Sequence, residues 1–348
     1  MKAVKQLGKM IGAAIVAVII LSLIVSVYSL SPLREKNPQG NTDYVWKPDS
    51  LWANMSEGVS FGRMDANGFN NLEVTENPDI ILLGSSHIES KNVNQNENTA
   101  YYLTENFDSR YSVYNMGISG HALYKVCQYL PDTLSIYQDN EPKYIVIETD
   151  DIDLTKAGVD AVLNHTVEKT PVYDSGLVAT LQKNPAFRLF YHQLDSGMME
   201  TLFPELAKNK TMQSNSAVEV QDNEITSTET SKPYVDTAPY DELMSYLGDL
   251  EQQYNTDIII FFHPYEQLNA DGSLSFTNNE NTAVFAEYAE KYGITYIDMT
   301  DSFEQMYDED HHVPHGFITG EIASGHLNKY GHKAIADQLY DTISGMEG

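Results

Sequence analysis

The sequence predicts an α/β fold built on an open, parallel sheet. From residue 79 onward, short apolar runs alternate with helical patterns, and strands separated by helices form parallel sheets with right-handed crossovers. The first run, Ile80–Leu83, carries no polar interruption, as expected for a strand buried on both faces. It ends in Gly84-Ser85-Ser86-His87, which places a hydroxyl at the sheet edge where such folds bind ligands.

The same reasoning assigns the remaining elements. Strands are expected at 79–85, 112–116, 143–149, 257–263 and 294–298. Helices are expected at 97–107, 121–138, 240–254, 281–292 and 329–345.

The amino terminus predicts a membrane anchor. Lys2, Lys5 and Lys9 precede an uncharged run from Met10 to Val27, about the minimum length for a bilayer span. Positive charge keeps its own side in the cytoplasm. We therefore expect a cytoplasmic tail at 1–9, a transmembrane signal anchor at 10–30 and an extracytoplasmic remainder, hence a single-pass protein of the cell membrane. Cleavage after 27–29 with secretion is the alternative.

Beyond the anchor, we expect a stalk at 31–59 and one domain at 60–348. A helical insertion is expected at 155–205, and a low-complexity loop at 208–239, where large apolar residues are few. The chain has 50 Asp and Glu residues against 21 Lys and Arg. This balance excludes a nucleic-acid partner, which requires a basic surface.

Three stretches carry groups suited to acyl chemistry. Ser86 is a potential nucleophile at the end of the first strand. The glycines of 114–121 can turn the backbone and expose N–H groups, as an oxyanion site demands. His326 precedes the last predicted helix on an expected loop, from which a neutral imidazole can take the serine proton. His332 falls inside that helix and is expected to be structural.

Together these stretches resemble the SGNH/GDSL hydrolase superfamily. The resemblance rests on Gly84-Ser85-Ser86-His87, on Asn115-Met116-Gly117-Ile118-Ser119-Gly120 and on the segment 326–332, in that order. It implies a flavodoxin-like three-layer sandwich, with Ser86 as nucleophile and His326 as base. It also implies the Ser86 and Gly120 N–H groups as oxyanion donors.

Two departures from the family pattern stand out. The acid usually found three residues before the histidine is replaced by Ala323. Glu321, Ser324 or a carboxylate of 308–310 could orient His326 instead, or the site could work as a Ser-His dyad. The segment 146–151 lacks the asparagine that the family places after the third strand, and its Asp150 and Asp151 would repel an oxyanion. Thr149 or His87 could substitute for the missing oxyanion donor. His263 follows a predicted strand at the same edge of the sheet, and Asn115 and Gly117 belong to the glycine loop, so these three are further candidates for supporting residues of the site.

The segment 61–69, with Gly68-Phe69 just upstream of the first strand, also resembles membrane-anchored members linked to O-acetylation of cell-envelope glycans. The resulting hypothesis is a serine esterase or O-acyltransferase acting on a cell-surface glycan, with no cofactor or metal. An SGNH-like protein that binds glycan, or partners a multi-span membrane acyltransferase without catalysis, is the alternative. A metal-dependent hydrolase built on His311, His312 and His315 is the third hypothesis, since imidazoles and neighbouring carboxylates can bind zinc.

Overall fold

The computed structural model describes residues 2–139, 142–172, 235–276 and 281–347, with the single positions 180, 181, 183, 184 and 187. The chain divides into two compact units, residues 1–27 with 175–235 and residues 28–174 with 236–348. In the first unit, helix α1 (Lys2–Tyr28) contains an apolar span, Val4–Val25, with a mean hydropathy of 2.5. This span is long and apolar enough to cross a bilayer.

The second unit is built on a five-stranded parallel sheet. Its strands are β6 (Ile80–Leu83), β7 (Val113–Asn115), β8 (Tyr144–Thr149), β9 (Asp257–Phe262) and β12 (Thr295–Asp298). They lie in the order β7-β6-β8-β9-β12, which is the flavodoxin-like 2-1-3-4-5 order. The predicted fold class is therefore confirmed, and all five expected strands are present.

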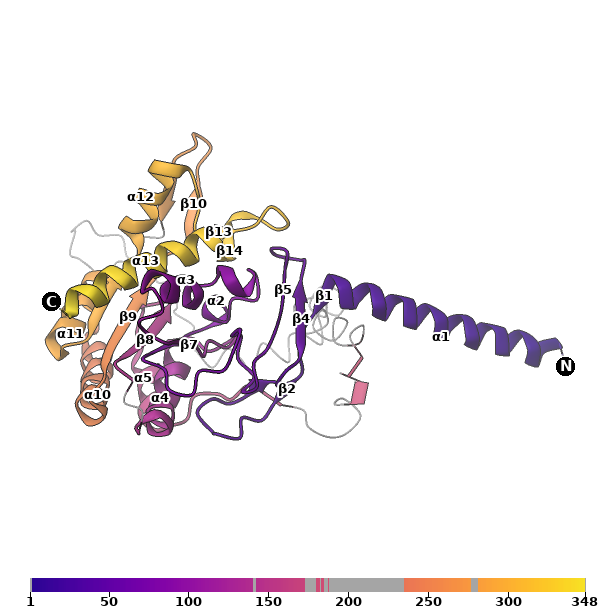
Figure 1. The fold of residues 1–348 in the computed structure, drawn as a ribbon, viewed down its shortest axis with the longest axis horizontal. Coiled ribbons are helices and arrows are strands. Elements are labelled where there is room, and N and C mark those ends of the chain that lie inside the picture. The colour runs from indigo at the N-terminus through magenta and orange to yellow at the C-terminus, as the bar shows by residue number, and fades with distance from the viewer. Residues whose placement is uncertain are drawn as a thin grey trace, which may run out of the picture. The chain divides into compact units, whose positions relative to one another are not determined.

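Helices cover both faces of this sheet (Figure 1). On one side lie α2 (Ser86–Glu89), α3 (Thr99–Asn106), α12 (Thr300–Asp310) and α13 (Lys329–Met346). A 3₁₀ turn at Gln95–Glu97 precedes α3. On the other lie α4 (Leu123–Tyr137), α5 (Lys156–Leu163), α10 (Ala238–Tyr254) and α11 (Thr282–Tyr292). The result is the predicted three-layer arrangement.

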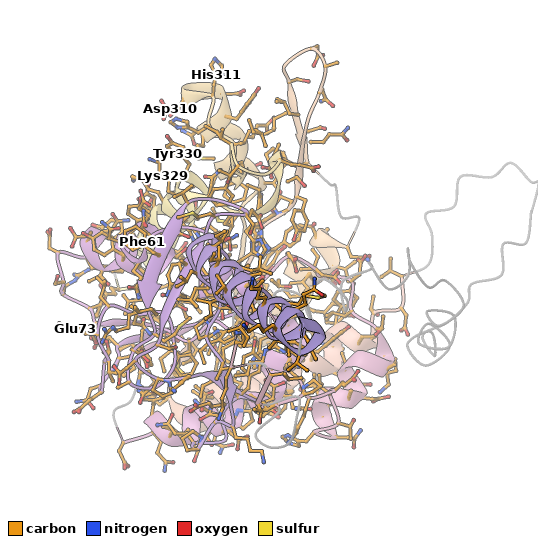
Figure 2. All side chains as sticks on the ribbon, turned by 90° about the vertical axis from the view of Figure 1, so that its right-hand side faces the viewer. Phe61, Glu73, Asp310, His311, Lys329 and Tyr330 are labelled. Atoms are coloured by element: carbon orange, nitrogen blue, oxygen red, sulfur yellow. The ribbon has the colours of Figure 1, made fainter. Side chains whose placement is uncertain are left out.

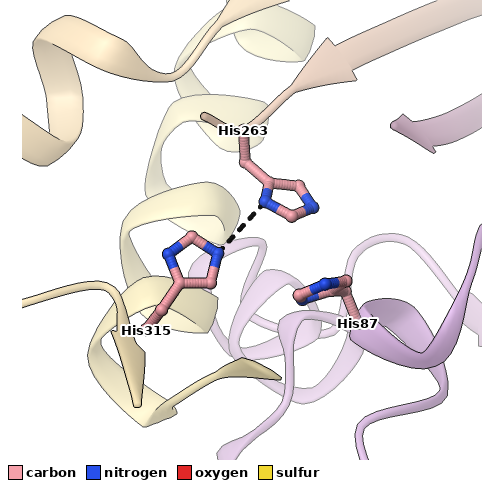
Figure 3. A group of neighbouring side chains, drawn as sticks. All are labelled: His87, His263 and His315. Atoms are coloured by element: carbon pink, nitrogen blue, oxygen red, sulfur yellow. Dashed lines mark hydrogen bonds between the residues drawn. The ribbon is translucent and has the colours of Figure 1, made fainter. Parts of the chain in front are cut away.

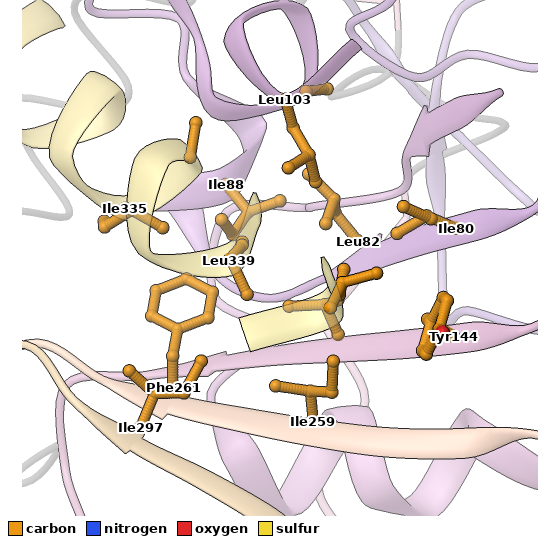
Figure 4. Close-up of a cluster of buried hydrophobic side chains, with 14 of the residues drawn as sticks. Ile80, Leu82, Ile88, Leu103, Tyr144, Ile259, Phe261, Ile297, Ile335 and Leu339 are labelled. Carbon is orange, nitrogen blue, oxygen red and sulfur yellow. The ribbon is translucent and has the colours of Figure 1, made fainter. Parts of the chain in front are cut away.

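Alternation along the strands fills both layers of the core. Ile80 and Leu82 of β6 face the layer that holds Leu103 of α3 and Leu339 of α13 (Figure 4). Side chains of neighbouring positions on a strand point to opposite faces, so Ile81 is buried against the other layer. Because both faces are covered, the strands carry continuous apolar runs, and this is why they could be predicted from the sequence.

Short antiparallel strands form small sheets apart from the five-stranded sheet. They pair as β1 (Ser29–Leu30), β4 (Leu51–Asn54) and β5 (Ser60–Arg63), as β2 (Arg34–Glu35) with β3 (Val45–Trp46), as β10 (Glu266–Leu268) with β11 (Leu274–Phe276), and as β13 (His315–Gly316) with β14 (Ile322–Leu327). None of these strands was predicted. The expected loop around His326 is wrong, because this residue lies in β14.

The expected stalk at 31–59 is also wrong. Tyr44, Trp46 and Trp52 are at most 5% exposed, and the Trp46 indole donates a hydrogen bond to Glu89 at the end of α2. Burial of such large aromatic groups is strongly favourable, so this segment folds onto the domain. Within the expected insertion at 155–205, α5 is described, whereas most of the remainder and the expected loop up to residue 234 lie outside the described residues.

Candidate active site

Ser86 occupies the first position of α2, directly after the turn that ends β6. Ser85 caps this helix, since its hydroxyl accepts a hydrogen bond of 3.3 Å from the His87 N–H. The neighbours β7 and β8 flank β6, so the turn lies where the strand order reverses. Open α/β sheets bind ligands at this point.

His326 lies directly against Ser86. Its Nε2 is 2.9 Å from the Ser86 Oγ. Strand β14 carries the histidine, and Asn328 begins α13 by accepting hydrogen bonds from the N–H groups of Tyr330 and Gly331. The structure thus brings together two groups that are 240 residues apart in the sequence.

The acid of this site is Glu57. Its Oε2 lies 2.7 Å from His326 Nδ1, and its Oε1 accepts a hydrogen bond of 2.6 Å from the His326 backbone N–H. Because Nδ1–H donates to the carboxylate, the Nε2 lone pair faces the serine hydroxyl, which is the tautomer that a general base requires. Burial alone would raise the pKa of Glu57, but the hydrogen bonds from His326 outweigh it and lower this pKa.

The acids expected from sequence spacing do not occupy this position. Both ring nitrogens of His326 already have partners, namely Glu57 and Ser86. Glu321 and Ser324 are exposed on the β13–β14 hairpin, and residues 308–310 end helix α12. Glu57 was missed because it lies in the segment taken as a stalk. It precedes Gly58, which takes a φ of +84° in the turn that follows.

Gly325 makes room for this acid. A Cβ at this position would lie 2.3 Å from Glu57 Oε1, and the residue has a φ of +83°. A side chain is therefore excluded both by the contact and by the backbone conformation.

The backbone N–H groups of Ser86 and Gly120 are the oxyanion donors that the family resemblance implies. Within the described part of the chain, the N–H groups of Ser86 and Gly120 donate to no protein acceptor. Gly117 does not serve in this way, because its N–H donates to the Asn115 side chain at 2.8 Å. Asn115 in turn donates to the Ile88 carbonyl at 2.6 Å, so it fastens the glycine loop to α2.

Glu148 stands on β8, in the segment where the family asparagine was expected. Its Oε2 accepts a hydrogen bond of 2.6 Å from the Ser85 N–H. Gly84 permits this contact, since a Cβ there would lie 2.5 Å from the same oxygen. The carboxylate thus holds the turn that carries Ser86. Thr149 is engaged elsewhere, because its hydroxyl donates to the Asp151 carbonyl at 2.5 Å.

Three further histidines form a buried cluster beside the triad (Figure 3). His87, His263 and His315 come from α2, from the residue after β9, and from β13. All three are at most 4% exposed. Burial lowers the pKa of His87 well below its usual value, with further lowering by His263 and His315. Tyr265 closes one side, with its hydroxyl 3.2 Å from His87 Nε2 and 2.9 Å from Asp150.

The metal set expected from 308–315 is not assembled. His311 ends α12, is exposed (Figure 2) and has its Nδ1 3.0 Å from the Tyr307 carbonyl. His312 stacks on Tyr330 with 3.6 Å between the ring centroids. Only His315 turns into the protein. The hypothesis of a metal site made of these three histidines is therefore wrong.

The arrangement is suited to nucleophilic acyl transfer. A serine hydroxyl, a correctly oriented imidazole and a carboxylate are linked by hydrogen bonds. This combination can form and resolve an acyl-serine intermediate.

No protein-family model matches the chain, and no curated protein matches it either. Among solved structures, it is similar to the acetyl xylan esterase AlAXEase, with 12% identity, a TM-score of 0.38, and coverage of 76% of this chain and 98% of the other. It is similar to LAE5, an α/β hydrolase enzyme from the Lake Arreo metagenome, with 12% identity, a TM-score of 0.35, and coverage of 78% and 97%. It is also similar to Axe2, an acetylxylan esterase of Geobacillus stearothermophilus, with 12% identity, a TM-score of 0.34, and coverage of 76% of this chain and 93% of the other.

Proposed function

We propose that this chain is a membrane-anchored serine esterase or O-acyltransferase that acts on a cell-surface glycan through an acyl-serine intermediate. The observation that carries the proposal is the hydrogen-bonded series Ser86–His326–Glu57, with links of 2.9 Å and 2.7 Å.

The reaction follows from this geometry. Ser86 Oγ attacks the ester carbonyl and gives its proton to His326 Nε2, while Glu57 stabilises the resulting imidazolium. The N–H groups of Ser86 and Gly120 stabilise the oxyanion. The alkoxide leaves with the proton from His326, and the acyl group remains on Ser86. Water or a sugar hydroxyl then loses a proton to His326 and attacks the acyl carbon. The bond from this carbon to Ser86 Oγ breaks, His326 returns the proton to Oγ, and the acyl group leaves on the acceptor oxygen.

The exposure of the triad supports a polymeric substrate. The side chains of His326 and Glu57 are 31% and 26% exposed, so the reacting groups lie at the surface. An acyl group on an extended glycan could reach them without passing through a closed channel. The apolar span of α1, with Lys2, Lys5 and Lys9 around its amino-terminal end, supports an anchor whose carboxyl-terminal side faces out of the cytoplasm.

Covalent labelling tests the proposal. We expect the full chain in detergent micelles to hydrolyse p-nitrophenyl acetate and to be labelled by a fluorophosphonate on Ser86. Ser86→Ala should abolish both, whereas Ser275→Ala, which changes an exposed serine on β11, should retain them. Absence of labelling in a folded wild-type chain would contradict the proposed catalysis and support the non-catalytic alternative.

The group that accepts the acyl group from Ser86 distinguishes hydrolysis, in which it is water, from transfer, in which it is a sugar hydroxyl. If the chain is a transferase, addition of a cell-wall oligosaccharide should yield acylated sugar at the expense of free acetate. If it is an esterase, pre-acetylated oligosaccharide should lose acetate without formation of a new ester.

A further inference from the structure

The histidine cluster beside the triad takes no part in the proposed acyl transfer. One nitrogen each of His87, His263 and His315 lies within 4.8 Å of the others, and the three rings converge from separate elements (Figure 3). The nitrogens of His87 contact the Leu327 N–H at 3.3 Å and the Tyr265 hydroxyl at 3.2 Å. The inner nitrogens of His263 and His315 instead face each other, and this contact between two basic nitrogens requires an explanation.

The spacing of two rings fits a shared metal ion. His263 Nδ1 and His315 Nε2 are 3.2 Å apart. Two nitrogens bound to one tetrahedral zinc at about 2.0–2.1 Å would be separated by roughly 3.3 Å. These two nitrogens therefore already lie at the distance that one tetrahedral ion imposes on its ligands.

The outer nitrogens of the same rings are held by carboxylates. His263 Nε2 lies 2.8 Å from Glu148 Oε1, and His315 Nδ1 lies 2.6 Å from Glu266 Oε2. Glu266 also accepts a hydrogen bond of 2.9 Å from the His315 backbone N–H. Since a carboxylate only accepts, each ring donates its outer N–H, and its inner nitrogen faces the other ring. Metal-binding histidines are oriented by carboxylates in this way.

The buried carboxylates of Glu148 and Glu266 also favour a bound cation. Glu148 and Glu266 are 1% and 7% exposed. Among the described residues, their ion-pair partners are these two histidines, and no lysine or arginine is paired with either carboxylate. Buried carboxylates that have no lysine or arginine partner are costly in a protein interior. A divalent ion between the rings would compensate their charge.

We propose that His87, His263 and His315 bind one Zn²⁺ ion, with Glu148 and Glu266 as positioning residues. His263 and His315 supply two nitrogens at the required separation, and His87 joins them by exchanging one of its two hydrogen bonds, to the Leu327 N–H or to the Tyr265 hydroxyl, for the ion. Three histidines leave a fourth coordination position open. Because His87 follows Ser86, and Glu148 holds the Ser85 N–H, the ion would fix the turn that carries the nucleophile.

Metal titration of the full chain in detergent tests this proposal. After removal of metals with a chelator, we expect one equivalent of Zn²⁺ to bind, and Co²⁺ to give the intense visible absorption of a tetrahedral site. His263→Gln and His315→Gln should each abolish the Co²⁺ spectrum, and Glu148→Gln should weaken Zn²⁺ affinity by about 10- to 100-fold. Ser86→Ala should bind as the wild type does, which separates this test from that of the proposed catalysis.

A His311→Gln/His312→Gln double variant is the matched control, since it removes two histidines outside the cluster. It should retain the stoichiometry and the spectrum. Loss of binding in this variant, or absence of a tetrahedral Co²⁺ spectrum in the folded wild type, would overturn the proposal and assign a shared proton to the His263–His315 contact. If a cluster variant fails to fold, the Co²⁺ spectrum of the folded wild type still decides whether a tetrahedral site is present.

Discussion

At the scale of single residues, Glu57 has the most consequence for the site. It contacts both the ring and the backbone N–H of His326, so it fixes the tautomer, the ring orientation and the path of β14 together. An acid that contacted only Nδ1 would leave the ring free to tilt about that bond. Through these two contacts, a carboxylate from outside the main sheet orients the imidazole of His326.

Glu57→Gln should reduce the kcat for p-nitrophenyl acetate by about 10²- to 10⁴-fold and change KM little, because an amide cannot stabilise the imidazolium of His326. Steady-state kinetics of purified variants give both values. Glu321→Gln is the matched control, since Glu321 is an exposed carboxylate close to His326 in the sequence, and we expect it to retain wild-type kinetics. Equal losses in the two variants would contradict the assignment of Glu57.

The contact between Ser86 and His326 was expected from the sequence, whereas that of Glu57 with His326 was not. A serine after a buried strand and a histidine before a helix each leave a local pattern. The acid lies 269 residues from the histidine that it orients, and it follows a segment that reads as polar and turn-rich. The buried Trp46 and Trp52 were the signal that this segment is folded. Its register on the domain is a tertiary property that no local pattern encodes.

At the scale of elements, the glycine loop after β7 supports the nucleophile helix α2. A Cβ at Gly117 would lie 2.4 Å from the Glu89 nitrogen and 2.6 Å from the Ile88 carbonyl carbon. The loop can pack against α2 only because residue 117 has no side chain. Asn115 then fastens the two segments through the Ile88 carbonyl.

Gly117→Ala should therefore displace α2. We expect a loss of about 1–3 kcal/mol in the free energy of unfolding, as for other overpacked sites, together with slower fluorophosphonate labelling of Ser86. Urea titration and labelling rates measure the two effects. Gly345→Ala is the control, because nothing lies within 4 Å of its added Cβ in α13. It should change stability by no more than about 1 kcal/mol, and labelling should stay the same. Normal labelling in Gly117→Ala would contradict this role.

Local periodicity predicted the large elements well and the small ones poorly. The five central strands and helices α3, α4, α10, α11 and α13 follow apolar runs or stripes. The hairpin β13–β14 has positive φ angles at Ala323 and Gly325 and pairs through tertiary contact. Its strand character is absent from the residues themselves.

At the scale of the whole molecule, α13 closes the fold against α3. The buried ring of His332 contributes to this contact, with its Nδ1 2.9 Å from the Thr99 hydroxyl. Burial, followed by the nearby histidines, lowers the pKa of His332 to about 3. The last helix thus joins the domain through a ring that must stay neutral.

The free energy of unfolding should consequently fall in acid. Between about pH 6.5 and 3, the unfolded chain binds a proton at His332 that the folded chain does not, so stability rises with pH and is lost as pH falls through this window. From pH 7.5 to pH 5, the loss from this one group is roughly 2 kcal/mol. In His332→Gln, the difference in urea-derived stability between these two pH values should shrink by that amount, whatever the variant costs at neutral pH. His311→Gln, which changes an exposed histidine, should retain the wild-type difference. An unchanged pH dependence in His332→Gln would show that acid acts elsewhere in the fold.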